Sequence, residues 1–242
     1  MELYIIGFII VGIFAAYFLY NKSSANKVNT EIIERRKNFV SSKSPTARVI
    51  VNNGTHLFYI DSEQGYFGVD ETDKTYDLEN MQSVNIYKEG ISIIHNTTFL
   101  YIGREPSRAN ETTPLDSISI SLIAAVVLPV LRENLHKKLV THGIEPTLEY
   151  EHDGTICGCD LSSKVFYTTF GSISLYDFSA LRSVKVEDLS NNTLYDGNYI
   201  IRIAIKTDFS WDDEIDFTFY SKNKMFYDLL TMFKEIKKRG YR

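Results

Sequence analysis

Histidine and carboxylate side chains are the groups of this chain most able to do chemistry, and their spacing fits no catalytic motif. No HExxH segment, nucleophile elbow, P-loop or dinucleotide-binding glycine segment occurs. We therefore expect no catalytic residue, no cofactor and no metal site. We interpret the five histidines as surface side chains: His56, His95, His136, His142 and His152. The alternative is a membrane-tethered enzyme with a dispersed site, in which histidine and carboxylate side chains converge in a pocket, for instance His152 and Asp153 near Asp160.

The two cysteines, Cys157 and Cys159, lie two residues apart. On a strand they would point to the same face, where a disulfide between them is geometrically awkward. As metal ligands they form only half of a zinc site, because the chain has no second pair. We interpret them as small buried residues, and a chain with only two cysteines also suits a reducing compartment.

The segment 208–216 carries five carboxylates and the only tryptophan. Tryptophan is favoured at binding hot spots, so this segment is a candidate loop for binding a protein partner. Its candidate residues are Trp211, Asp212, Asp213 and Glu214. The alternative is a solvated loop between two strands, with Trp211 covering the core. A calcium loop fits less well, because the alternating ligands and the central glycine are missing.

Charge is spread unevenly along the chain. Residues 22–48 carry a net charge of +5 and residues 234–242 carry +4, so residues 49–233 carry −13 of the total of −5. An acidic body repels phosphates, which excludes DNA and RNA as partners. The basic stretch after residue 21 suits an anionic membrane surface.

Residues 3–20 are uncharged and rich in isoleucine and phenylalanine. At about 1.5 Å per residue they match a hydrocarbon core of about 30 Å, which predicts a transmembrane helix. Because Lys22 and the cluster 35–37 follow this run, the positive-inside rule places the C-terminal body in the cytoplasm. The alternative, a cleaved signal peptide ending near Ala25, lacks a basic start and has too long an apolar run.

Two segments align with an offset of 100 residues. They are Tyr76-Asp-Leu-Glu-Asn-Met-Gln-Ser-Val84 and Tyr176-Asp-Phe-Ser-Ala-Leu-Arg-Ser-Val184. Four positions are identical, and the third and sixth positions are apolar in both. We expect the aspartate to cap a turn that directs the apolar pair inward, with a strand beginning at the serine. This internal repeat predicts two similar halves.

Strand and helix patterns around each segment support that division. Upstream hairpins turn after Asp61 and Asp160, whose side chains can bond the following amides. Downstream strands are expected at 91–95, 99–103, 199–206 and 215–220. Helices at about 119–141 and 223–238 close the halves, the first of them buried. We predict an α+β chain: anchor 1–21, basic linker 22–47 with a short helix ending before Pro45, and β-rich domains 48–143 and 144–242.

Several strands followed by a closing helix, twice, resembles the pleckstrin-homology-like (PH-like) superfold, and in particular bacterial membrane-anchored proteins with tandem domains of this kind. In lipid-binding members basic residues in the first hairpin hold phosphates, whereas these turns contain Ser62, Glu63 and Gln64, and Ser162, Ser163 and Lys164. We therefore favour a non-catalytic scaffold that binds a protein partner at the cytoplasmic face. A lipid or ligand sensor at the membrane surface is the alternative.

Overall fold

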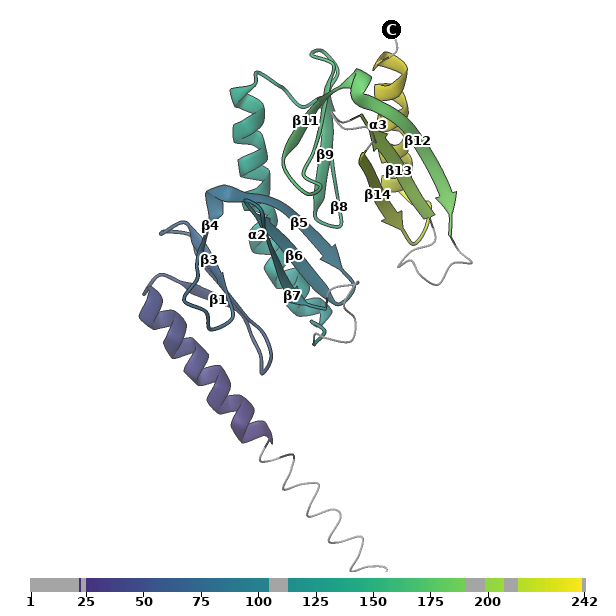
Figure 1. Ribbon diagram of the computed structural model, residues 1–242. Helices are drawn as coiled ribbons and strands as arrows, with labels where there is room; N and C mark the ends of the chain where they lie inside the picture. Colours follow the sequence, from purple (N-terminus) through teal and green to yellow (C-terminus); the bar gives the residue numbers. More distant parts are fainter. Residues whose placement is uncertain (1–21, 23–24, 105–112, 190–198, 207–212, 241–242) are drawn as a thin grey trace, which may run out of the picture. The chain divides into compact units, whose positions relative to one another are not determined.

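The computed structural model describes residues 22, 25–104, 113–189, 199–206 and 213–240 (Figure 1). Three helices and antiparallel sheets in that part of the chain confirm the predicted α+β class. The predicted anchor at residues 3–20 lies outside the described residues. The chain divides into two compact units, residues 1–76 and 77–242.

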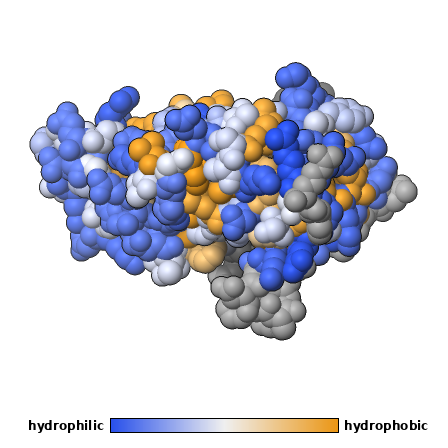
Figure 2. Space-filling model, turned by 90° about the horizontal axis from the view of Figure 1, so that it is seen from above, coloured by the Kyte–Doolittle hydropathy of each residue, from blue (hydrophilic) through white to orange (hydrophobic). Residues whose placement is uncertain are grey.

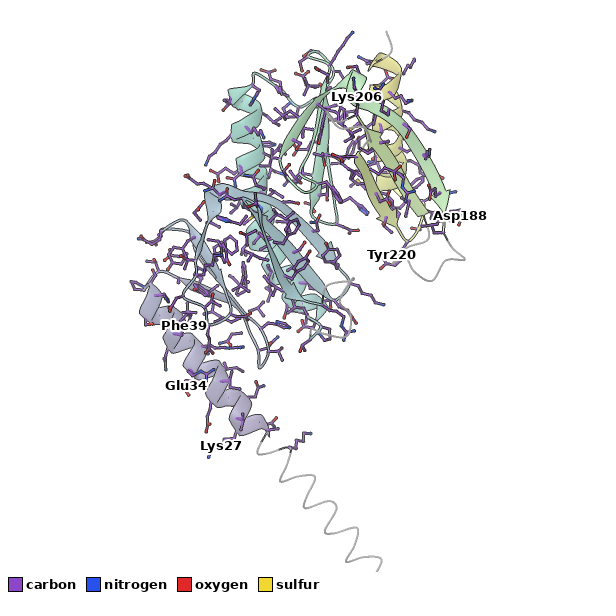
Figure 3. All side chains as sticks on the ribbon, viewed as in Figure 1. Lys27, Glu34, Phe39, Asp188, Lys206 and Tyr220 are labelled. Atoms are coloured by element: carbon purple, nitrogen blue, oxygen red, sulfur yellow. The ribbon has the colours of Figure 1, made fainter. Side chains whose placement is uncertain are left out.

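In the first unit, a helix at residues 25–43 packs on a sheet with the order β1-β2-β3-β4. The strands are β1 (Arg48–Asn52), β2 (Leu57–Asp61), β3 (Tyr66–Val69) and the short β4 (Tyr76–Asp77). Val40 of the helix is buried against Leu57 and Tyr59, and Phe39, labelled in Figure 3, meets the Tyr59 ring edge-on at 6.4 Å. The predicted helix before Pro45 is confirmed, and it belongs to the folded unit.

Basic residues of this helix form ion pairs within the same unit. Arg36 donates to the Asn53 carbonyl at 2.7 Å and pairs with Glu71 at 3.0 Å. Arg35 also pairs with Glu71, and Lys43 with Asp73. Residues 25–43 are therefore a docked helix and not the loose linker that composition alone suggests, because carboxylates of the loop after β3 bind three of its cations.

From β1 onward the same order of elements occurs twice. The first series continues through η1 (Leu78–Asn80), β5 (Met81–Tyr87), β6 (Gly90–His95), β7 (Thr98–Gly103) and α2 (Ser117–Thr141). The second contains β8 (Leu148–His152), β9 (Thr155–Asp160), β10 (Val165–Thr168), β11 (Ser174–Asp177), η3 (Phe178–Ala180), β12 (Leu181–Asp188), β13 (Tyr199–Ile205), β14 (Asp213–Phe219) and α3 (Lys224–Gly240). Each series has a four-stranded sheet, a three-stranded sheet and a closing helix.

The Tyr-Asp segments form the short helices between the two sheets of each series. Leu78 and Met81 are buried in one, and Phe178 and Leu181 in the other, as predicted for the apolar pair. The Asp77 carboxylate accepts from the Asn80 amide at 2.9 Å, whereas the side chain at 177 makes no such cap. Both strands begin two residues before the predicted serine, and each register shifts at that point.

The two predicted aspartate turns are confirmed. Asp61 Oδ1 accepts from the amides of Glu63 and Gln64 at 3.1 and 3.0 Å. Asp160 Oδ1 accepts from the amides of Ser162 and Ser163 at 2.8 and 3.3 Å. Hydrogen bonds from Ser162 hold the pKa of the Asp160 carboxyl well below its usual range.

A tyrosine ring covers a glycine on the neighbouring strand in both hairpins, but the two residues exchange strands. Tyr59 on β2 faces Gly68 on β3, whereas Gly158 on β9 faces Tyr167 on β10. A Cβ atom at either glycine would collide with the ring opposite. The glycines are therefore required for the close approach of each ring to the backbone.

The second series encloses one hydrophobic core. Its two sheets and α3 contribute, with Phe217 and Phe233 rings 5.5 Å apart near its centre. Cys157 and Cys159 are fully buried on β9, which confirms their interpretation as small core residues. Burial raises the pKa of Cys159 to about 11 and that of Cys157 further, so both remain protonated thiols.

One face of the helix α2 is buried in a core, and its other face lies at the surface. Ile123, Val127 and Leu131 are fully buried, whereas Ile118 is 71% exposed. The predicted burial therefore holds for one face only. By length and composition α2 is the one helix in the described ranges apolar enough to cross a membrane, and 33% of its apolar stretch is buried within the structure.

Replacing Asp160 by asparagine should destabilise the chain by about 1–2 kcal/mol at pH 7, because charged acceptors make stronger hydrogen bonds. The folded-state pKa of Asp160 lies below the unfolded value of about 3.9, so its contribution is present above that pH and is lost as the pH falls. Urea unfolding of the full chain in detergent should show a smaller difference in the free energy of unfolding between the unaltered chain and the variant at pH 3 than at pH 7. Glu133→Gln, on the exposed face of α2, is the control, and its free energy of unfolding should show no such difference from that of the unaltered chain.

Candidate interaction surface

The acidic segment is partly a strand. Trp211 and Asp212 lie outside the described residues. Asp213 and Glu214 open β14 and pair with Ile205 and Ala204 of β13. The interpretation as a loop is therefore wrong for Asp213 and Glu214, because the seven residues of β13 find seven partners in β14, whereas residues 215 and 216 lie in the strand predicted at 215–220. Both side chains are exposed, as a partner-binding site requires.

Arg202 organises the charge on this sheet. On the central strand β13, it forms a bidentate pair with Asp216, with Nε to Oδ1 at 2.7 Å and Nη2 to Oδ2 at 2.8 Å. Glu187 of β12 lies 3.2 Å from Nη1, and Glu214 lies 3.6 Å from Nε. These contacts, that with Asp216 first, raise the Arg202 pKa. One cation shared by three carboxylates leaves a negative face that includes Glu214.

Three labelled residues show which end of this sheet is which. Figure 3 places Asp188 and Tyr220 at one end of the β12-β13-β14 sheet and Lys206 at the other. Asp213 pairs with Ile205, so the acidic candidates lie at the Lys206 end. Of the four candidate residues, the structure thus brings Glu214 into the Arg202 group and leaves Asp213 exposed beside it.

An exposed aromatic pair lies on β7. Phe99 is 60% exposed and Tyr101 is 39% exposed, and their rings stack with centroids 6.5 Å apart. In the described residues β7 is the last strand of the order β5-β6-β7, so its outer edge is open to another strand. Solvent-exposed rings on an edge strand are unfavourable alone and typical of a surface that binds another protein.

Further apolar side chains reach the surface on α2. Ile118 and Leu122 are both exposed and lie one helical turn apart. Figure 2 shows apolar side chains between hydrophilic ones on the face it presents. Sequence reasoning missed the β7 pair, although β7 shows a signal for it. Aromatic residues alternate with Leu100 and Ile102, which makes both faces of the strand apolar.

A basic cavity lies at the end of α3. Its volume is about 360 Å³, and it is lined by Lys164, Glu235, Lys238 and Arg239. Arg239 pairs with Glu235 at 2.7 Å, so the two lysines supply the excess positive charge. Lys164 is held in the β9–β10 turn with a φ of 56°, and its carbonyl accepts from the Phe178 amide at 2.9 Å. The cavity can receive an anion.

The histidines make separate contacts. His152 donates to the Thr218 carbonyl at 2.6 Å, stacks on Phe219 and lies 3.3 Å from Asp153. Asp160 is at the far end of β9, because His152 pairs with Thr155. His152 and Asp153 therefore do not meet Asp160, which was the example given for the enzyme alternative. Within residues 25–104, 113–189, 199–206 and 213–240, no three histidine, cysteine or acidic side chains are grouped as metal ligands.

Comparison of the chain with models of protein families, with curated proteins and with solved structures gives no match. The surfaces described above are therefore interpreted from their own geometry.

Replacing Arg202 by glutamine should leave Asp216, Glu187 and Glu214 without the cation that all three contact. We expect a loss of about 1–2 kcal/mol at pH 7, because the hydrogen bonds to a charged group are lost. Lys185→Gln removes the exposed cation directly opposite on β12 and should cost under about 0.5 kcal/mol. Equal effects of the two variants in chemical unfolding would contradict the role of Arg202.

Proposed function

We propose that this protein is a membrane-anchored, non-catalytic scaffold that binds another protein through β7. Residues 3–20 would cross the bilayer and the body would face the cytoplasm. The observation that carries the binding role is the stacked, exposed pair Phe99 and Tyr101 on an open strand edge. Aromatic side chains of this kind supply much of the binding energy of protein interfaces.

The element order supports a body of two PH-like domains. In each series four antiparallel strands precede three more and a closing helix. In the second series the two sheets and α3 share one core, as a closed β-domain requires. We propose domains 48–143 and 144–242 on this basis. Domains of this shape serve many functions, so the binding role rests on the β7 surface and not on the fold.

The docked helix at residues 25–43 gives the scaffold a defined geometry. Its 19 residues are about 28 Å long at 1.5 Å per residue. Arg36 and Lys43 fasten its second half to the loops after β1 and β3, through the Asn53 carbonyl and Asp73. The helix follows the anchor directly in the chain. It would therefore hold the body at a set distance from the bilayer, where a partner can be positioned.

Changing both Phe99 and Tyr101 to alanine should release the partner without unfolding the chain. The full-length tagged protein is extracted gently from its native membrane, and the co-purified proteins are quantified. Loss of an aromatic hot spot costs about 2 kcal/mol or more, or roughly 30-fold in affinity. Phe170→Ala, at another ring that is 43% exposed, should retain the partner. Retention by the β7 variant would remove the basis of the proposal.

A second candidate function, sensing of an anionic ligand, is favoured by the basic cavity. Lys164 and Lys238 line it beside the Arg239–Glu235 pair, and their two ammonium groups, which form no ion pair within the described residues, attract phosphate. Lys164 lies in the turn that the sequence analysis compared with the phosphate-binding hairpin of the resembled superfold, but in the structure the strand β8 precedes that hairpin. A ligand there would touch the β9–β10 turn and the end of α3 together.

Inositol trisphosphate is a suitable probe for that cavity. Calorimetry on the full chain in detergent at low salt should detect binding that weakens at least tenfold in the Lys164→Ala, Lys238→Ala double variant. Lys137→Ala changes an exposed lysine paired with Glu133 on α2 and should not alter it. Binding that is equal in all three proteins would indicate general charge attraction and would exclude the cavity as the site.

A further inference from the structure

The turn between β8 and β9 docks on the free edge of β5. The amide of Ile86 donates to the Asp153 carbonyl at 2.9 Å. Gly154 lies so close to the strand that a Cβ atom there would be 2.7 Å from the Val84 carbonyl oxygen. Asp153 and Gly154 have φ values of 48° and 83°, which is the conformation of a tight two-residue hairpin turn. This edge therefore recognises a hairpin tip through its backbone.

The helix α2 holds the same hairpin by charge. Arg132 lies 3.4 Å from Glu149 and 3.5 Å from Glu151, both on β8. His136 Nε2 lies 3.0 Å from Glu149 Oε2. The hairpin is thus bound by a strand edge at its tip and by basic side chains of a helix along its acidic first strand. Both parts of this contact lie within the unit 77–242.

The strand β12 repeats the geometry of β5. Each ladder is shifted at the same place, after Met81 in one and after Leu181 in the other. Each also begins with the same backbone bond, which the carbonyls of Asn80 and Ala180 accept. Because bonds alternate along an antiparallel pair, Val186 directs its amide outward as Ile86 does.

The edge of β12 is open where that of β5 is filled. In the described residues β12 is the last strand of its sheet, and Val186 is 42% exposed. The helix α3 packs along β12 as α2 packs along β5, and Lys237 donates to the Arg182 carbonyl. Lys234 and Lys238 are exposed on the same part of α3 and can supply the positive charge that Arg132 supplies on α2.

We propose that the edge of β12 beside α3 binds a tight β-hairpin of a partner protein, with glycine at its tip and carboxylates along its first strand. This is the kind of segment that the β5 edge already binds within the chain. The surface is separate from the β7 pair, so the two proposals stand or fall independently.

A second copy of this chain is a poorer occupant. The counterpart hairpin, β1–β2, is covered at its tip, where Gly54 lies against Asn29 of the docked helix and the Asn53 carbonyl accepts from Arg36. The strand β1 also lacks the negative charge that β8 carries. By register, Val49 and Asn52 stand where β8 has Glu149 and Glu151. The other hairpin of a second copy already fills its own β5 edge.

The probe is a cyclised, fluorescent peptide of residues 148–160, which carries Glu149, Glu151 and the Asp153-Gly154 turn. Its binding to the full chain in detergent is followed by anisotropy, and the contact is mapped by hydrogen exchange. We expect saturable binding with protection of residues 181–188. Val186→Pro removes one outward amide and should weaken binding at least tenfold. Lys234→Glu should weaken it about threefold or more at low salt.

Controls separate this edge from other causes. Lys88→Glu reverses an exposed charge in the β5–β6 turn and should leave binding unchanged. A peptide with Glu149→Gln and Glu151→Gln should bind more weakly to the unaltered chain. No saturable binding, or protection at 81–87 in place of 181–188, would overturn the proposal. Concentration-dependent association of the chain alone, abolished by Val186→Pro, would make a second copy the occupant and would also overturn it.

Discussion

The hydrogen bond from the Ile86 amide to the Asp153 carbonyl joins the two series of elements. A sheet edge leaves amides and carbonyls without partners, and a chain of small sheets has many such edges. Here one edge is satisfied by the next hairpin of the same chain, and α2 neutralises the carboxylates that come with it. This joint lies within the unit of residues 77–242, which contains parts of both series.

The need to pair the backbone groups of a sheet edge applies equally to the exposed edge strands. In the described residues, β7 and β12 are the outer strands of the two three-stranded sheets. Neither carries a proline, and each exposes apolar side chains, Phe99 on one and Val186 on the other. Outer strands that expose apolar side chains favour pairing with another strand, and both binding proposals rest on this property.

Much of the fold follows from local signals in the sequence. Asp61 and Asp160 bond the amides that follow them within three residues, so both turns and their flanking strands were predictable with small errors. The strand β8 was not, because Leu-Glu-Tyr-Glu-His reads as a solvated segment. Its glutamates are compensated by Arg132 and His136, which lie on a different element and are brought near only by the folded chain. The Arg202 group is also invisible until the strand register is known, and Trp211 lies outside the described residues.

The exchange of tyrosine and glycine between neighbouring strands affects how the two halves compare. Tyr59 faces Gly68 and Tyr167 faces Gly158, so the ring and the glycine beneath it form one contact in either orientation. Changing one member alone would place two rings, or none, in a space that fits one. An alignment scored position by position counts two mismatches where the architecture has a single shared contact. Relatedness between the halves is therefore underestimated by residue identity and is better judged by pairs.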